Sequence, residues 1–184
     1  MMTLRILIIV ALQTIALGWM ILDRQHMLDS SRTVTLKVVP VDPRDLFRGD
    51  YVVLNYDISR LDVSRLSGTK TLAPGNTIYV RLRRTADTWT AVTLSNTHEK
   101  PSDTEISLKA QILSMDAPGT GGSQFMTLSY GIESYFVPQG TGLAIEEAAR
   151  KGTVSVDAAI DEKGRAAIKA IRQNGQLIHV EGIL

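Results

Sequence analysis

The residues best suited to chemistry gather in one short stretch of mixed charge. Asp42, Asp45 and Asp50 place three carboxylates within nine residues, with Arg44 and Arg48 between them. Carboxylate oxygens are the ligands that a divalent cation prefers. However, the two arginines neutralise the cluster, and the spacing is not that of a calcium-binding loop. The stretch therefore predicts a loop held by ion pairs, and we expect no metal site.

Acid–base hydrolysis is the second chemistry to weigh. Asp50, Glu133 and Glu146 could supply paired carboxylates, which such a reaction needs within about 5–10 Å of each other. Nucleophilic catalysis has no comparable signal, because the chain lacks a G-x-S-x-G turn and its histidines (His26, His98 and His179) are scattered. We therefore expect no catalytic residue and no cofactor. An envelope hydrolase that uses Asp50 and Glu133 remains the alternative.

Composition limits the class of protein further. The 184 residues suffice for one ordinary domain and an appendage. Twenty basic and nineteen acidic residues leave a net charge of +1, whereas a nucleic-acid binder needs a concentrated basic face. The chain contains no cysteine, which excludes disulfides and zinc-thiolate sites. We expect no nucleic-acid partner.

The N-terminal segment reads as a membrane anchor. Residues 6–22 are apolar except for Gln13 and Thr14. As a helix they would span about 25 Å, close to the roughly 30 Å of a hydrocarbon core. The alternative is a signal peptide cleaved near the small residues of 16–18, but the apolar run continues through Trp19–Leu22. We therefore expect residues 1–24 to be a single transmembrane helix that contacts the lipid bilayer through residues 6–22.

The orientation of that helix rests on two opposing signals. Arg5 alone precedes the span, whereas Arg24, Arg32 and Lys37 follow it. A literal count of positive charges would place the body in the cytoplasm. A very short tail before a single span favours export of the long domain instead. We expect a single-pass membrane protein, with residues 25–32 as a linker and residues 33–184 as an extracytoplasmic domain.

Apolar and polar residues alternate in many short runs of the body, which is typical of strands with one buried face. The clearest runs are 34–38, 106–112, 126–132 and 154–160. Asn174-Gly175 predicts a tight hairpin, Asp161–Gly164 another reversal, and Thr85–Asp87 a third. One short helix is expected at 143–150. The fold predicted is mostly antiparallel β, an open barrel or a sandwich, with one short helix after the transmembrane helix.

The string Gly49-Asp50-Tyr51-Val52-Val53-Leu54-Asn55-Tyr56 is the most specific motif. It predicts a turn that leads into a half-buried strand. Leu54 and Tyr56 then point into the core, where the Tyr56 hydroxyl needs a partner. Tyr51 falls on the opposite face, where a partner protein could contact it.

Gly49, Asp50, Tyr51, Leu54 and Tyr56 make the chain resemble the bacterial GDYXXLXY family. A second block, residues 130–138 with Gly131 and Pro138, also resembles that family. The family is uncharacterised, so the resemblance implies a membrane-anchored bacterial protein without a known reaction. With the orientation expected above, this would be a protein of the bacterial inner membrane with a periplasmic domain. Members are often encoded beside multi-span membrane proteins, which implies a complex with such a protein.

We therefore expect an accessory or binding module of a membrane complex, without catalysis of its own. The candidate partner-binding residues come from the two family blocks: Asp42, Arg44, Asp45, Arg48, Asp50, Tyr51, Glu133 and Tyr135. The alternatives are the envelope hydrolase and a periplasmic ligand sensor. A sensor would need an apolar cavity inside the sheet.

Overall fold

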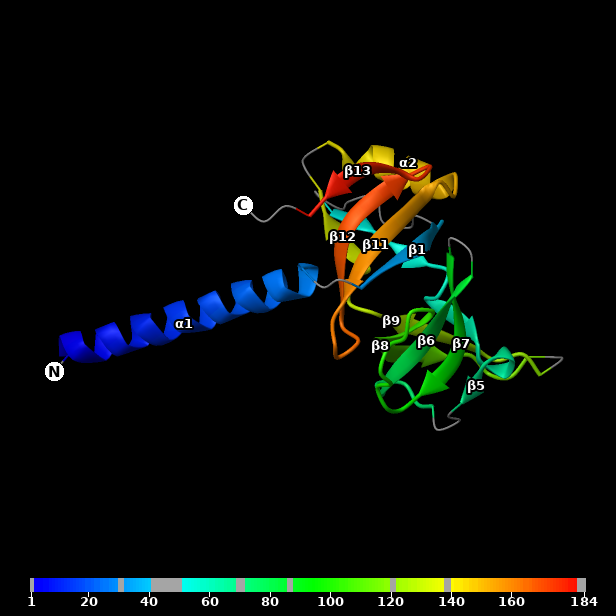
Figure 1. Ribbon diagram of the computed structural model, residues 1–184, viewed down its shortest axis with the longest axis horizontal. Coiled ribbons are helices and arrows are strands. Elements are labelled where there is room, and N and C mark those ends of the chain that lie inside the picture. Colours follow the sequence, from blue (N-terminus) through cyan, green and yellow to red (C-terminus); the bar gives the residue numbers. More distant parts are fainter. Residues whose placement is uncertain are drawn as a thin grey trace.

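The computed structural model describes residues 2–29, 32–40, 51–68, 72–85, 88–119, 122–137 and 140–181. Helix α1 (Met2–Leu28) projects from a body made of strands, as Figure 1 shows. At 1.5 Å per residue it is about 40 Å long. The helix is long and apolar enough to cross a membrane, and it continues through residues 25–28, the start of the expected linker.

The first large sheet contains five strands in the order β13-β12-β11-β1-β3. Their bounds are β1 Thr33–Val39, β3 Asn55–Tyr56, β11 Val154–Ile160, β12 Ala166–Gln173 and β13 Gln176–Val180. Strands β11, β12 and β13 form the antiparallel meander predicted for the C-terminal part. Asn174 and Gly175 both have positive φ, 52° and 79°, which suits a two-residue hairpin with the twist of its strands.

The second large sheet contains six strands in the order β4-β9-β8-β6-β7-β5 and curls as a half-barrel. Their bounds are β4 Arg60–Asp62, β5 Ser67–Gly68, β6 Thr77–Thr85, β7 Thr88–Ser95, β8 Glu105–Met115 and β9 Phe125–Ser129. A single turn of 3-10 helix, Val63–Arg65, precedes β5. The pairing of β6 with β7 confirms the reversal predicted at 85–87.

Two small elements complete the body. Strands β2 (Tyr51–Val53) and β10 (Ser134–Phe136) form a separate two-stranded sheet. Helix α2 (Gly142–Arg150) confirms the predicted short helix and buries Ile145, Ala148 and Ala149. The predicted fold class is thus confirmed, although β5 pairs with β7 in parallel.

One apolar core joins both large sheets. The side chains predicted to share buried faces are buried: Val34, Leu36, Val38, Val52, Leu54, Tyr56, Ile58, Ile106, Leu108, Ala110, Ile112, Met126, Leu128, Tyr130, Ile132, Val154, Val156, Ala158 and Ile160. Strict alternation fails in β11, where Asp157 and Ala159 are buried as well. A register shift beside Asp157, and hydrogen bonds from Thr35 and Arg172 to its carboxylate, account for the buried aspartate.

Candidate partner-binding site

The two sequence blocks of the family lie side by side. Strand β2 pairs with β10, so that Val52 lies opposite Tyr135 and Tyr51 opposite Phe136. Just beyond this pairing, the Leu54 amide donates a 2.8 Å hydrogen bond to the Glu133 carbonyl. More than seventy residues separate the blocks along the chain, so their shared position is a product of the fold.

Two tyrosines hold these segments together, because each donates a hydrogen bond to a carbonyl of the other segment. The Tyr56 hydroxyl donates to the Ile132 carbonyl at 2.5 Å, and the Tyr130 hydroxyl donates to the Ile58 carbonyl at 2.8 Å. Both side chains are buried. Burial raises the pKa of both hydroxyls, and the Glu133 carboxylate adds to the effect. The expectation that Tyr56 needs a hydrogen-bond partner in the core is therefore confirmed.

Glu133 closes the turn between β9 and β10. Its carboxylate accepts hydrogen bonds from the Tyr130 amide at 2.5 Å, the Gly131 amide at 3.0 Å and the Ser129 hydroxyl at 2.9 Å. Gly131 has a φ of +79°, a conformation that costs glycine little. The carboxylate is therefore bound to its own turn, which is a structural role visible only in three dimensions.

Several predicted residues cannot be placed with these. Asp42, Arg44, Asp45, Arg48, Gly49, Asp50 and Pro138 lie outside the described residues. The backbone of Tyr51 belongs to β2, and Glu146 lies on α2. The pairing of Asp50 with Glu133 in a hydrolytic site, and partner binding by this set, stay predictions. Among the described residues, no three His, Asp or Glu side chains gather in a way that could hold a metal ion.

Tyr135 is buried beside the end of β13. Its ring meets His179 edge to face, with ring centres 5.4 Å apart. Burial raises the pKa of its hydroxyl, and the neighbouring Glu181 carboxylate adds to the shift. A small surface pocket of about 270 Å³ lies here, lined by Tyr135, His179 and Glu181 together with Arg24, Ser134 and Phe136. Arg24 brings the end of α1 into this site.

The end of α1 is fastened to the body by charged and apolar contacts. Asp23 accepts two 3.0 Å hydrogen bonds from Arg165, whose Nε also donates to Asp161 at 2.6 Å. Arg24 pairs with Glu181 at 3.2 Å. Met27 and Leu28 are buried against Ala167 of β12. We call this set the α1 clamp. Sequence patterns gave no signal for it, because Asp23 and Arg165 are 142 positions apart.

Large apolar side chains are exposed next to the clamp. Phe136 is 77% exposed on β10, and Leu177, Ile178 and Val180 are 52%, 42% and 49% exposed on β13. Strand β13 is an edge strand of its sheet. Phe136 lines the same small pocket as His179 of β13 and Glu181 just after it, which places it near the end of that strand. We call Phe136, Leu177, Ile178 and Val180 the β10–β13 surface. Strand alternation could have located Phe136, since Tyr135 before it and Val137 after it are both buried.

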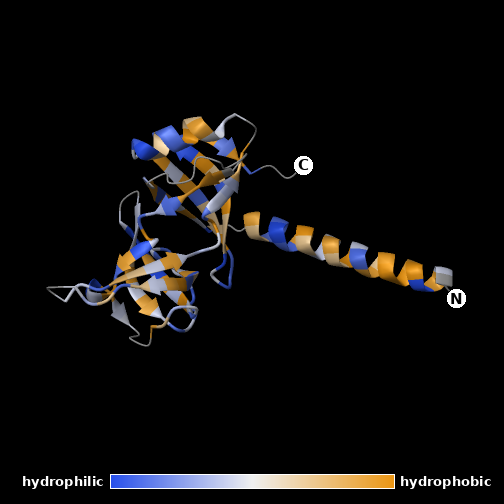
Figure 2. Ribbon diagram, turned by 180° about the vertical axis from the view of Figure 1, so that it is seen from behind, coloured by the Kyte–Doolittle hydropathy of each residue, from blue (hydrophilic) through white to orange (hydrophobic). Residues whose placement is uncertain are grey.

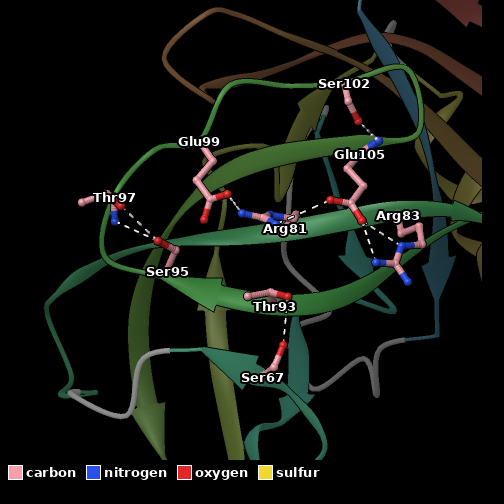
Figure 3. A network of polar contacts seen from close by, with 9 residues as sticks. All are labelled: Ser67, Arg81, Arg83, Thr93, Ser95, Thr97, Glu99, Ser102 and Glu105. Carbon is pink, nitrogen blue, oxygen red and sulfur yellow. Dashed lines mark hydrogen bonds and ion pairs between the residues drawn. The ribbon is translucent and has the colours of Figure 1, made fainter.

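On the six-stranded sheet, charged side chains of opposite sign pair with one another. Arg81 pairs with Glu99 and, at 3.6 Å, with Glu105. Glu105 also accepts from Arg83 at 2.8 Å, and Figure 3 shows these side chains converging across β6 and β8. The opposite charges contact one another, so this cluster fastens β6 to β8 and to the loop that carries Glu99.

A model of the family described as GDYXXLXY protein matches residues 13–171. The chain belongs to the GDYXXLXY family. The match includes both sequence blocks and the second half of α1, so the resemblance noted in the sequence is confirmed. No curated protein and no solved structure matches the chain. In this chain, hydrogen bonds of Tyr56, Tyr130 and Glu133 join the two segments that carry the resemblance.

Proposed function

We propose that this protein is a membrane-anchored binding module that docks on a multi-span membrane protein and carries no catalysis of its own. The observation that supports this most directly is the position of the β10–β13 surface beside the α1 clamp. An exposed apolar surface marks a site of protein or membrane contact. Its place next to the apolar helix puts the proposed contact close to the bilayer.

The anchor is the first part of the proposal. Large apolar side chains on all sides of α1 are more than half exposed, from Leu4 at 62% to Leu22 at 64%. Figure 2 shows the projecting helix coloured as hydrophobic over most of its length. A bilayer would cover these side chains through residues 6–22. Cleavage near residue 18 would leave Trp19, which is 74% exposed, in water, and this favours an uncleaved anchor.

The α1 clamp supports the second part of the proposal, which is a fixed orientation of the body above the membrane. A single exposed ion pair contributes only about 0–1 kcal/mol. Here the bidentate Asp23–Arg165 contact, the Arg24–Glu181 pair and the buried Met27 and Leu28 act on one helix end together. Such a combination would hold the body at one orientation above the membrane. The β10–β13 surface would then face a partner embedded in the same bilayer, on the periplasmic side of a bacterial inner membrane.

Two of the candidate residues predicted from the sequence lie near this surface. Tyr51 lies opposite Phe136 in the pairing of β2 with β10. Glu133 holds the turn from which β10 begins. Under this proposal Glu133 acts by positioning Phe136, while the charged residues of 42–50 would contact the partner.

Co-purification from detergent-solubilised membranes tests the proposal. Phe136→Glu changes an exposed side chain, so the fold should persist while the membrane partner is lost. Leu113→Glu is the matched control, because Leu113 is 55% exposed on β8 of the other sheet. Retention of the partner by Phe136→Glu would refute the proposed surface. Equal loss of the partner from both variants would also refute it, since the effect would then not be specific to the β10–β13 surface.

A further inference from the structure

A cleft of about 740 Å³, lined mostly by residues with polar side chains, lies between the two large sheets. Its floor is the outer face of the five-stranded sheet, where Lys37, Ser155 and Arg172 contribute from β1, β11 and β12. The β6–β7 hairpin forms the opposite wall with Arg84 and Trp89. In Figure 1 this hairpin lies on the side of the body away from α1. The cleft therefore faces the aqueous phase rather than the proposed membrane surface.

The floor of the cleft is ordered before any ligand arrives. Ser155 lies directly opposite both Lys37 and Arg172 in the strand register, so the three side chains form a row across the sheet. The Arg172 guanidinium is fixed, because Nε donates to Asp157 at 2.6 Å and Nη1 donates to the Gly175 carbonyl at 3.1 Å. Thr35 donates to the other Asp157 oxygen at 2.8 Å. Preorganised donors lose little entropy on binding.

The charge of the cleft favours an anion. Lys37, Arg84 and Arg172 line it, and the Asp157 carboxylate that pairs with Arg172 is buried beneath the floor. Lys37 forms no ion pair within the described part of the chain. By contrast Arg83, which lies next to Arg84 on β6 but outside the cleft, is paired with Glu105, as Figure 3 shows. Cationic donors form their strongest hydrogen bonds with carboxylate and phosphate oxygens. The floor thus presents Lys37 and the ion-paired Arg172 in one row, with Arg84 on the opposite wall.

The remaining lining restricts the class of anion. Trp89 packs partly against the apolar core and lines the cleft with the rest of its side chain, and an aromatic ring can pack against the apolar side of a ligand ring. Hydroxyls of Thr33, Thr88 and Ser155 can exchange hydrogen bonds with hydroxyl groups. The volume lies within the roughly 300–1,000 Å³ of small-ligand sites. We propose that the cleft binds an anionic saccharide, with its carboxylate or phosphate between Lys37 and Arg172 and its ring against Trp89.

Tryptophan fluorescence offers a direct test, because the chain contains only Trp19 and Trp89. In the full-length Trp19→Phe protein in detergent, Trp89 is the single reporter. Glucuronate and glucose 6-phosphate should give saturable changes in its emission. Glucose and inorganic phosphate should bind at least about tenfold more weakly, since each lacks one of the two contacts. Absence of binding by both acidic sugars would overturn the proposal, as would equal binding of glucose or of inorganic phosphate.

A pair of charge variants tests the location. In the same background, Lys37→Gln should weaken the binding of glucuronate about tenfold, because it removes one charged hydrogen bond. Lys100→Gln removes the same charge from an exposed loop outside the cleft and should leave the affinity unchanged. Thermal melting checks that both variants fold. Unchanged affinity in Lys37→Gln, or equal weakening in Lys100→Gln, would overturn the assignment. The inference is independent of the proposed docking on a membrane partner.

Discussion

Replacing Tyr56 by phenylalanine removes one oxygen from the centre of the fold. The hydroxyl donates to the Ile132 carbonyl at 2.5 Å, and both residues are buried, so no bulk water can replace it. When a buried acceptor loses its donor, the free energy of unfolding falls by about 1–3 kcal/mol. For a chain of this size, each kcal/mol lowers the melting temperature by about 2–4 °C.

Urea unfolding of the full chain in detergent, followed by circular dichroism, would measure this loss. Tyr79→Phe is the matched control, because Tyr79 is only partly buried on β6 and contacts His98 through its ring. Its free energy of unfolding should change by less than about 0.5 kcal/mol. A Tyr56→Phe protein as stable as the parent would refute the view that this hydroxyl joins the two family blocks.

The reciprocal bond permits a sharper test. The Tyr130 hydroxyl connects the same two segments in the opposite direction through the Ile58 carbonyl. If the two bonds act as one unit, the loss in the double Phe variant should differ from the sum of the single losses by at least about 0.5 kcal/mol. Strict additivity would mean that the two tyrosines act independently.

Three further predictions concern pH, backbone geometry and the clamp. Burial raises the pKa of Tyr56 and Tyr130 above the unfolded value of 10.0, so the folded state keeps protons that the unfolded state has released. Stability should be unaffected by these groups below pH 10 and should fall above it by about 1.4 kcal/mol per pH unit for each tyrosine. Phenylalanine at either position should remove one such contribution in urea titrations at alkaline pH; an unchanged slope would contradict this. Gly68→Ala should destabilise far more than Gly175→Ala in thermal melts, because an added Cβ would lie 1.9 Å from the Leu94 carbonyl oxygen in the first case and in open space in the second; equal losses would contradict the tight β5–β7 contact. Arg165→Gln should change stability by less than about 1 kcal/mol yet broaden the distance distribution between spin labels on α1 and β12, since exposed ion pairs orient more than they stabilise; an unchanged distribution would show that the clamp does not fix the helix.

Local patterns predicted most of the fold. Alternation located the buried faces of β1, β8, β9 and β11, and Asn174-Gly175 located the last hairpin, because both signals depend on neighbours in sequence. The short helix predicted at 143–150 is observed at Gly142–Arg150. In the same way, the largely apolar segment 6–22 located α1, although the docked end of the helix at Leu28 lies beyond that segment.

The arrangement of the site depends on contacts that local sequence patterns do not predict. The Glu133 carboxylate accepts hydrogen bonds from three donors of its own turn, whose geometry depends on Gly131 at positive φ, and no local pattern predicted these bonds. Partner binding by Glu133 stays a prediction. The cleft at Lys37 and Arg172 arises only where the β6–β7 hairpin approaches the first sheet. Residues that lie far apart in the sequence form no local pattern from which such a contact could be predicted.

Site-specific photo-crosslinking in intact membranes tests the central claim most directly. A benzophenone side chain in place of Phe136 should form an adduct with an integral membrane protein, because this position is proposed to face the partner. The same group in place of Leu113, on the other sheet, should form none. Failure to crosslink from position 136, or equal crosslinking from position 113, would contradict docking through the β10–β13 surface.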